Sequence, residues 1–208
     1  MKFDGFNGQA RRKEIFKQLL ALARPELIIE TGTCEGETTG YMAETSGLNV
    51  LTCEAMPERV DTATQRLKYM NVQVVEADSR AFLRAAAKRH SHTRTLFYLD
   101  AHWDVELPLT EELNIIFGSW PDFVVMIDDF KIDDDPGYGF DDYTNIDQGI
   151  IGMELISKLI RAHNVPVFFP VAKSDTETGA KRGSAYICSR GPMEKALAAS
   201  GLIRKVVP

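Results

Sequence analysis

The fold is decided by a short stretch near the start of the chain, Leu27-Ile28-Ile29-Glu30-Thr31-Gly32-Thr33-Cys34-Glu35-Gly36-Glu37-Thr38-Thr39-Gly40. Its apolar run ends in an acid and is followed by glycines at positions 32, 36 and 40. Such a pattern predicts a buried strand that breaks into a tight loop and then starts a helix. A glycine directly after a strand permits positive φ, and the helix that follows points unpaired N–H groups into the same space. We therefore expect this stretch to hold a ligand.

Outward from this stretch, apolar runs and helical patterns alternate along the chain. Seven strands are predicted, at 27–31, 50–55, 72–77, 96–99, 123–127, 167–171 and 185–188. Helices are predicted at 11–24, 37–46, 57–70, 80–88 and 110–120, and a further helix carries Ile151, Leu155 and Leu159. Alternation over the first five strands predicts a parallel sheet with helices on both faces. The last two strands are joined by a short polar segment, so we expect an antiparallel pair.

Length and composition indicate one globular unit. The chain has 208 residues, of which 44% are hydrophobic and 26% charged, enough for one sizeable core and without a compositional break. We therefore predict a single domain over residues 1–208. The polar, glycine-containing residues 1–10 are expected to be loosely ordered.

Charge and cysteine content argue against several classes of protein. A net charge of −6 disfavours a general nucleic-acid binder, and the basic run Lys88-Arg89-His90 is too short to reverse this. No apolar run approaches the roughly 20 residues that span a bilayer, and the first residues lack the apolar core of a signal peptide. We expect a soluble, cytoplasmic protein with no membrane partner. No CxxC pair or metal-ligand spacing links the three cysteines, Cys34, Cys53 and Cys188.

Acidic residues end each of the first five predicted strands. They are Glu30, Glu54, Asp78, Asp100 and the pair Asp128 and Asp129. In an open parallel sheet the ligand lies beyond the carboxyl ends of the strands, so these side chains are candidates for binding. A single carboxylate there is also a common turn former or helix cap, and for Asp78 that simpler role is as well supported. Five acidic ends in succession favour a function.

Two cofactors suit the glycine loop. A dinucleotide fingerprint needs a second glycine two residues after the first, and Cys34 stands there instead. S-adenosylmethionine (SAM) has no phosphate and needs carboxylates for its amine and ribose hydroxyls. Glu30, Gly32 and Gly36 suit its amino-acid end, and Glu54 suits the ribose. The adenine edge is matched by Ala77-Asp78-Ser79.

These motifs together resemble the class I SAM-dependent methyltransferases. The resemblance rests on segments 30–36, 53–55, 76–79, 98–103 and 126–130, and covers nearly the whole chain. It is strongest to the small metal-dependent O-methyltransferases of the catechol type and the macrolide-sugar type. It implies a seven-stranded sheet in the order 3-2-1-4-5-7-6 with strand seven antiparallel. We expect SAM to be held by Glu30, Gly32, Thr33, Gly36, Glu54, Ala77, Asp78, Ser79 and Asp100.

Three carboxylates at neighbouring strand ends form a candidate metal site. Asp100, Asp128 and Asp129 would offer oxygen ligands suited to Mg²⁺ or another hard divalent ion. Such an ion would lower the pKa of an acceptor hydroxyl and align it with the methyl group. In the simpler alternative Asp128 and Asp129 cap the following loop, and Asp100 is held by Trp103 or a backbone N–H.

Candidates for a general base and for a lid follow predicted strands four and five. His102 is the first candidate for the base, because its ordinary pKa suits proton transfer, and Lys131 and Asp104 stand behind it. Residues 133–143 combine acids and glycines with Tyr138, Phe140 and Tyr143, which fits either a substrate lid or a solvated loop. Residues 178–183 form either another edge of the pocket or a plain hairpin turn.

The sequence thus predicts SAM-dependent O-methyl transfer to a small hydroxylated acceptor, such as a sugar or natural product, assisted by a divalent metal. Three alternatives remain: a metal-dependent hydroxylase on the same fold, a module that only binds the cofactor, and an NAD oxidoreductase. A homo-oligomer is compatible with the sequence.

Overall fold

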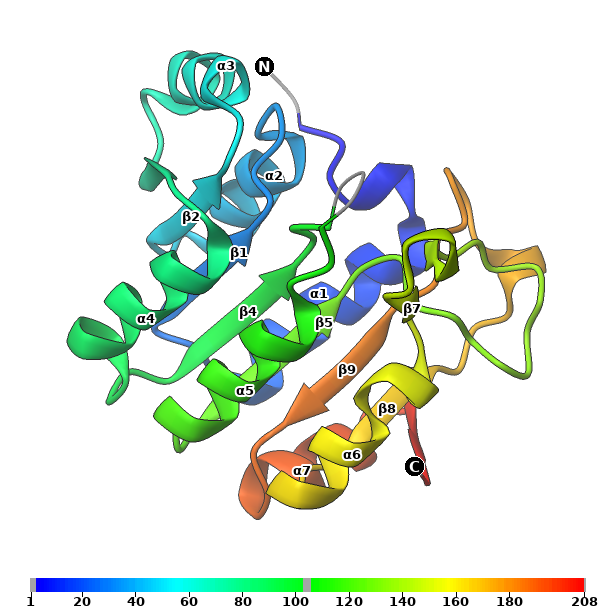
Figure 1. The fold of residues 1–208 in the computed structure, drawn as a ribbon. Helices are drawn as coiled ribbons and strands as arrows, with labels where there is room; N and C mark the ends of the chain where they lie inside the picture. Colours follow the sequence, from blue (N-terminus) through cyan, green and yellow to red (C-terminus); the bar gives the residue numbers. More distant parts are fainter. Residues whose placement is uncertain (1–2, 103–105, 208) are drawn as a thin grey trace.

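The computed structural model describes residues 3–102 and 106–207, and its centre is an eight-stranded sheet. The strands are β1 (Leu27–Thr31), β2 (Val50–Glu54), β3 (Val72–Glu76), β4 (Thr95–Leu99), β5 (Phe123–Ile127), β8 (Val167–Pro170), β9 (Ala185–Cys188) and β10 (Ile203–Val206). They lie in the order β10-β8-β9-β5-β4-β1-β2-β3 (Figure 1). Strands β1 to β5 are parallel, and β9, β8 and β10 join them through antiparallel pairs.

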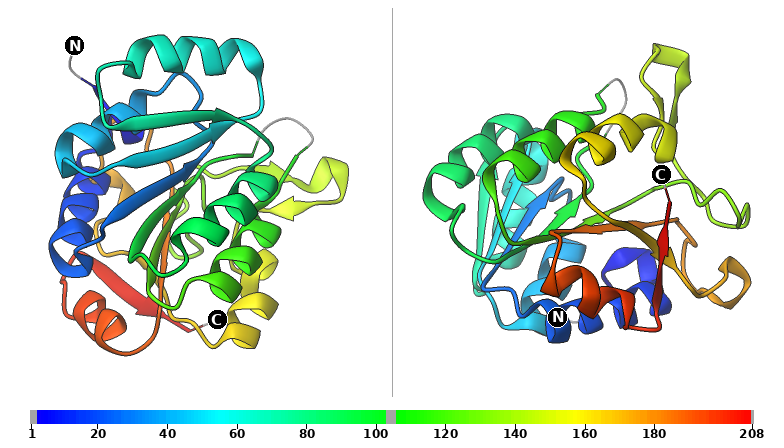
Figure 2. Two further views of the ribbon diagram at one scale, coloured as in Figure 1. Left: turned by 90° about the vertical axis from the view of Figure 1, so that its left-hand side faces the viewer. Right: turned by 90° about the horizontal axis from the view of Figure 1, so that it is seen from below.

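Helices cover both faces of the sheet (Figure 2). One face carries α1 (Ala10–Ala23), α2 (Glu37–Ser46) and α7 (Pro192–Ala198), and α3 (Pro57–Leu67) packs beside β2 and β3. The other face carries α4 (Ser79–His90), α5 (Leu109–Ser119) and α6 (Met153–His163). None of the helices in the described part of the chain has both the length and the apolar character that a membrane span requires.

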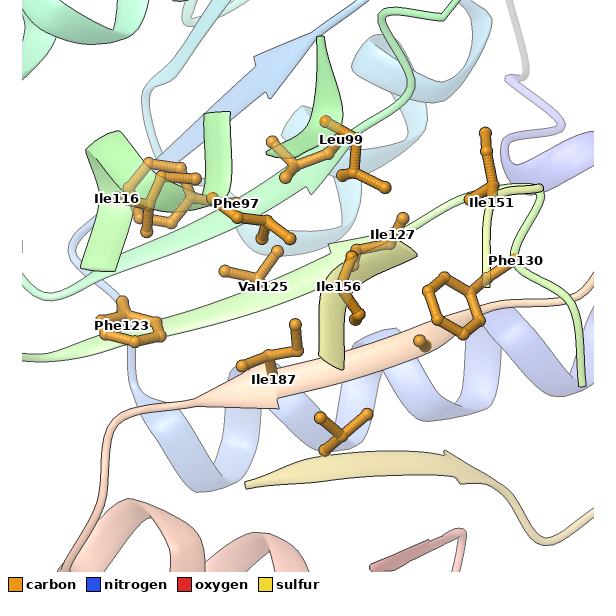
Figure 3. Packing of buried hydrophobic residues seen from close by; sticks show 14 of the residues in the cluster. Phe97, Leu99, Ile116, Phe123, Val125, Ile127, Phe130, Ile151, Ile156 and Ile187 are labelled. Atoms are coloured by element: carbon orange, nitrogen blue, oxygen red, sulfur yellow. The ribbon is translucent and has the colours of Figure 1, made fainter. Parts of the chain in front are cut away.

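Alternate side chains of each central strand enter two different cores. In β5, Val125 and Ile127 face α5 and α6, whereas Val124 and Met126 face α1. Figure 3 shows the first of these cores, where Ile116 of α5 and Ile156 of α6 lie over the central strands. Because both faces are buried, the strands are near-continuous apolar runs, which explains why the sequence marks them so clearly.

The predicted parallel sheet covered by helices on both faces is confirmed, but the predicted count of seven strands is wrong. Residues 203–206 form an eighth strand, β10, which pairs with β8 at the edge of the sheet. Only Ile203 of this strand is fully buried, and Arg204 and Lys205 face outward. Charged residues are common on edge strands because they discourage pairing with other chains, and they hide the strand from an apolar pattern.

Other short elements also lack an apolar period. Two-residue strands β6 (Asp142–Tyr143) and β7 (Gly149–Ile150) form a separate antiparallel ribbon within and after the segment predicted as loop. Ile151, expected on the following helix, is buried just before α6 begins. The predicted antiparallel pairing of the strands at 167–171 and 185–188 is confirmed by β8 and β9.

The described residues before α1, for which loose order was expected, pack against the rest of the chain. Phe6 is fully buried and contacts Phe16, Tyr41 and Tyr98 through its ring. Gln9 is 1% exposed. These contacts place the start of α1 beside the carboxyl ends of the central strands.

Glu30, at the end of β1, is a carboxylic acid enclosed by the fold. It is 1% exposed and accepts hydrogen bonds from the hydroxyls of Thr39 and Thr52 at 2.5 and 2.7 Å. Burial raises the pKa of Glu30 from 4.5 to about 7, because the two hydroxyl donors compensate only part of the desolvation of the charged form.

This raised pKa predicts a pH-dependent stability. Between pH 4.5 and 7 the folded state binds a proton that the unfolded state has lost, so stability falls as pH rises through this window. The difference between a pKa of 4.5 and one of about 7 corresponds to roughly 3 kcal/mol, at about 1.4 kcal/mol per pH unit. Glu30→Gln removes this titration, so the wild type should lose roughly 3 kcal/mol more than the variant between these pH values. Urea unfolding of both proteins at pH 4.5 and at pH 7 measures this difference in the free energy of unfolding.

The matched control is Glu35→Gln, because Glu35 is an exposed glutamate of the same loop and should leave the pH dependence unchanged. Parallel stability curves for the wild type and Glu30→Gln would contradict the raised pKa of Glu30.

Candidate functional site

A cavity of about 430 Å³ opens at the carboxyl ends of the parallel strands, the edge toward which the arrows of β1, β2 and β4 point (Figure 1). The glycine loop after β1 and the segments that follow β2, β3, β4 and β5 all contribute to it. Its lining residues are Gly32, Cys34, Cys53, Glu54, Ala55, Met56, Arg59, Ala77, Asp78, Ser79, Arg80, Asp100, Ala101, His102, Glu106, Pro108, Asp129 and Asp141.

The glycine loop lies close to the end of β4. Gly32 has φ +85°, and a Cβ at this position would lie 2.2 Å from the carbonyl oxygen of Asp100. Any side chain here would therefore push β4 and the loop apart. Cys34 also has positive φ, at 48°, and its backbone N–H donates to Glu54 Oε2 at 2.8 Å. The loop and the acid after β2 are thus held as one unit.

Glu54 is fixed by backbone donors rather than by a cationic side chain. Its Oε1 accepts from the N–H groups of Ala55 and Met56 at 2.9 and 3.0 Å, and its Oε2 accepts from Cys34. The side chain lines the cavity although the residue is only 8% exposed. A carboxylate held in this way keeps its orientation and has acceptor capacity left on Oε2.

The segment after β3 lines the far end of the cavity. Asp78 caps α4, accepting from the N–H groups of Arg80 and Ala81, and also pairs with the Arg80 guanidinium. The helix-cap role considered for Asp78 is therefore present in the structure, and the residue lines the cavity as well. Ala77 and Ser79 line it on either side.

Three residues predicted to bind the cofactor lie behind the cavity wall. Both Glu30 and Thr33 are buried; Glu30 accepts from Thr39 and Thr52, and the Thr33 hydroxyl hydrogen bonds to that of Thr52. Gly36 begins α2 with φ +78°, and a Cβ there would lie 2.8 Å from Leu67 Cδ1. These residues shape the loop from inside and do not face the cavity.

At the other end of the cavity, Asp100, His102 and Asp129 form a cluster that could hold a metal ion. Each offers one ligand atom, and the three atoms lie within 4.8 Å of one another. His102 Nε2 lies 3.2 Å from Asp129 Oδ2 and 3.7 Å from Asp100 Oδ1. Two of these residues, Asp100 and Asp129, were predicted as metal ligands, and His102 was predicted as a base.

The carboxylates determine the charge of His102. Burial alone would lower its pKa, but the hydrogen bond to Asp129 and the charges of Asp100 and Asp129 raise it to about 9. The pKa of Asp129 is lowered to about 2, because His102 and Arg182 outweigh its partial burial. At neutral pH the ring is therefore a cation in this arrangement, and the predicted base role requires that it first lose a proton.

Asp128, predicted as a third metal ligand, does not join the cluster. Arg12 of α1 forms an ion pair with its Oδ1, which also accepts from the N–H of Asp129 at 2.7 Å. The hydroxyl of Tyr98 donates to Oδ2. Asp128 and Arg12 are each at most 1% exposed, so this carboxylate is fully engaged inside the protein. The next residue, Asp129, has φ +54° and lines the cavity.

Of the other candidates for the base, Lys131 does not line the cavity. Lys131 is directed toward Asp133 and the ring of Phe140, away from the lining residues. Asp104 and Trp103 lie outside the described residues. In the segment predicted as a lid, Tyr138 and Tyr143 are 3% and 7% exposed, so two of its three aromatic side chains are packed inside the protein.

Two further residues complete the cluster and were not predicted from the sequence. Arg182 forms ion pairs with both Asp129 and Asp141, and Asp141 lines the cavity. Asp141 was part of an acidic loop without a distinguishing pattern. Residues 178–183 had been considered as an edge of the pocket, but nothing singled out Arg182.

Comparison with known proteins identifies the fold. The sequence matches no protein-family model and no curated protein. Among solved structures, the O-methyltransferase from Bacillus cereus in complex with SAH is similar at a TM-score of 0.64 and 17% identity, over 87% of this chain and 81% of that one. The O-methyltransferase TomG from Streptomyces achromogenes, in complex with SAM, gives a TM-score of 0.62 at 14% identity, over 88% and 81% of the two chains.

The same fold also carries another activity. Spermidine synthase from Thermotoga maritima is similar at a TM-score of 0.56 and 14% identity, over 90% of this chain and 63% of that one. The chain therefore shares a Rossmann-like fold with these solved structures. At these identities the similarity concerns the fold, and the activity must be argued from the site.

The Arg12–Asp128 pair predicts a large coupling in stability. Arg12→Met leaves a buried carboxylate unpaired and should lower the free energy of unfolding by about 3–5 kcal/mol. Asp128→Asn should destabilise similarly, whereas the double variant should be much less destabilised than the sum of the two. Urea unfolding of the four proteins gives the coupling energy.

Arg11→Met is the control, since Arg11 pairs with Glu14 on the same helix but is about half exposed. It should leave stability nearly unchanged. Additive effects of Arg12→Met and Asp128→Asn would contradict a direct interaction between the two side chains.

Proposed function

We propose that the protein is a SAM-dependent O-methyltransferase that acts on a small hydroxylated acceptor with the help of a divalent metal ion. One observation carries the proposal: a single cavity is lined both by Gly32, Glu54 and residues 77–79 and by Asp100, His102 and Asp129. A donor cofactor and a cation-bound acceptor would thus share one cavity. Methyl transfer by direct displacement requires such proximity and alignment.

The cofactor end suits SAM on chemical grounds. Glu54 keeps acceptor capacity on Oε2 for a ribose hydroxyl, and Gly32 leaves the backbone bare beside the ligand. The similar structures solved in complex with SAM or SAH support this cofactor. Cys34 at the position of the second fingerprint glycine disfavours a dinucleotide. Ala77 and Ser79 would flank the adenine.

The donor set of the cluster fits a divalent cation. Two carboxylates and one imidazole converge within 4.8 Å, and such mixed oxygen and nitrogen ligands suit Mn²⁺ or another transition metal as well as Mg²⁺. When bound, the ion would lower the pKa of the acceptor hydroxyl and hold its oxygen in place. Asp100 is 32% exposed and loosely hydrogen bonded, so it can turn toward a ligand.

His102 has one nitrogen directed at the carboxylates, so it cannot both bind an ion and accept a proton there. Nε2 is that atom, and Asp100 and Asp129 surround it. We assign His102 to ion binding, as a neutral ligand once its proton has left. Burial and the charge of Asp128 raise the pKa of Asp100.

A metal-dependent hydroxylase remains the second candidate because of the same donor set. One histidine and two carboxylates with space beside them are also the kinds of ligand found at non-haem iron sites. Stoichiometric redox-active iron in the purified protein, together with no methyl transfer, would favour this activity.

Cofactor binding is tested by calorimetric titration with SAM. The wild type should bind one equivalent, and Glu54→Gln should weaken binding by about 10- to 100-fold, the range for a lost hydrogen bond to a charged group. Glu35→Gln, on the exposed side of the same loop, should bind like the wild type. Binding of NADH in place of SAM would overturn the cofactor assignment, and equal affinity of Glu54→Gln would remove Glu54 from it.

The role of the ion is tested by methyl transfer from labelled SAM to a panel of hydroxylated sugars and natural products. Mn²⁺ or Mg²⁺ should stimulate transfer, and Asp129→Asn should reduce stimulated turnover by at least about tenfold while leaving SAM affinity close to that of the wild type. Turnover that is equal with and without a chelator would remove the ion from the proposal.

A further inference from the structure

Arg182 lies between two carboxylates of the cavity. Its Nε donates to Asp129 Oδ1 and its Nη2 donates to Asp141 Oδ1. A guanidinium is a planar fork of donors, so it fixes the relative orientation of two carboxylates in a way that a single ammonium group cannot. The two aspartates come from different segments, one directly after β5 and the other before β6.

The second oxygen of each carboxylate lies close to the same nitrogen of His102. Asp129 Oδ2 lies 3.2 Å and Asp141 Oδ2 lies 3.5 Å from His102 Nε2, while Asp100 Oδ1 lies 3.7 Å from the same nitrogen. Arg182 therefore occupies the outer oxygens of Asp129 and Asp141 and leaves the inner oxygens directed at the cluster. Asp141 thus lies next to the group formed by Asp100, His102 and Asp129, in contact with its histidine.

The N-terminal segment holds the backbone of Arg182 in place. The buried side chain of Gln9 accepts from the N–H of Arg182 and donates to its carbonyl, both at 2.9 Å. Arg12 donates to the same carbonyl. At the next residue, Gly183, a Cβ would lie 2.1 Å from the carbonyl oxygen of Phe130, so only glycine lets this loop approach the end of β5.

We infer that Arg182 is a positioning residue for the divalent cation and that Asp141 is a further ligand of that cation. The inference rests on the metal-assisted function proposed above and extends it to two residues of the loops around the cavity. Arg182 acts through Asp129 and Asp141, and Gln9 acts through Arg182. Outer partners that orient metal ligands typically contribute about 10- to 100-fold to metal affinity.

A simpler role for Arg182 makes the opposite prediction. If Arg182 only supplies a positive charge that balances the acids, it competes with the metal ion, and its removal should strengthen metal binding. Arg182→Lys separates the two roles, since lysine keeps the charge but cannot bridge both carboxylates with a rigid fork. Arg182→Met removes both the charge and the fork.

The experiment is a titration of the purified protein with Mn²⁺, in which free Mn²⁺ is measured by electron paramagnetic resonance, with SAH affinity measured by calorimetry on the same samples. Arg182→Lys and Arg182→Met should each weaken Mn²⁺ binding by about 10- to 100-fold. Asp141→Asn should weaken it by at least about tenfold, and Gln9→Leu in the same direction. SAH affinity should stay within about twofold of the wild type, because these residues lie away from Glu54 and residues 77–79.

Arg190→Met is the matched control. Arg190 also pairs with an acid and a backbone carbonyl, but its partners are Glu194 and Asn164 at the opposite edge of the sheet. It should leave Mn²⁺ and SAH affinity unchanged.

Three outcomes overturn the inference. Tighter Mn²⁺ binding by Arg182→Met with unchanged binding by Arg182→Lys would assign Arg182 a purely electrostatic role. Parallel loss of Mn²⁺ and SAH binding in both variants would assign it to the stability of the fold. Absence of Mn²⁺ binding in the wild type would remove the metal ion altogether, and SAH binding in the same samples would then show whether the cofactor part of the proposed function survives.

Discussion

The buried ion pair between Arg12 and Asp128 is the constraint on which the arrangement of the site depends. It joins the start of α1 to the end of β5, and both side chains are at most 1% exposed. A buried charge without a partner is strongly unfavourable, so α1 and the strand end must be placed together. Because the pair occupies Asp128, the carboxylate that lines the cavity is that of the next residue, Asp129. Tyr98 ties β4 to the same group.

Around this pair, two halves of the cavity are built by different means. The half lined by Gly32 and Glu54 is made mostly of backbone: the glycine loop approaches β4, and Glu54 is held by three N–H groups. The half around His102 is made of charged side chains from three segments of the chain: Asp100 and His102 follow β4, Asp129 follows β5, and Arg182 precedes β9. His102 contacts both acids, and Arg182 pairs with Asp129. Such a network has several arrangements of charge available, and a ligand cation would select among them.

Local sequence patterns explain why the fold, and the half of the cavity lined by Gly32 and Glu54, could be predicted. Each central strand is an apolar run because both faces of the sheet are covered, and parallel strands bring their carboxyl ends to one edge. That rule alone placed Gly32, Glu54, Ala77 and Asp78 around one cavity. It failed for β10, because a strand at the edge with Arg204 and Lys205 facing outward has no apolar period. It also could not separate residues that line the cavity from Glu30, Thr33 and Gly36, which lie just behind it.

The half of the cavity around His102 could be predicted only in part, because contacts between residues distant in sequence decide which side chains lie there. Nothing local distinguishes Asp128 from Asp129, and the choice is made by Arg12, 116 residues away in sequence. His102 was found because it follows a strand end, but its charge depends on Asp129 and Asp100. Asp141 and Arg182 lie in polar loops, where a functional carboxylate or guanidinium cannot be told from a solvated one.

The contacts of the N-terminal segment also set an order of events during synthesis. Arg12 reaches Asp128 across 116 residues, and Gln9 reaches Arg182 across 173. A chain that emerges from the ribosome with its N-terminus first carries α1 long before either partner exists. The final burial of Arg12 against Asp128 therefore requires that β5 has already been made. The contacts of Gln9 and Asp129 with Arg182 form later still, after residue 182 has left the ribosome.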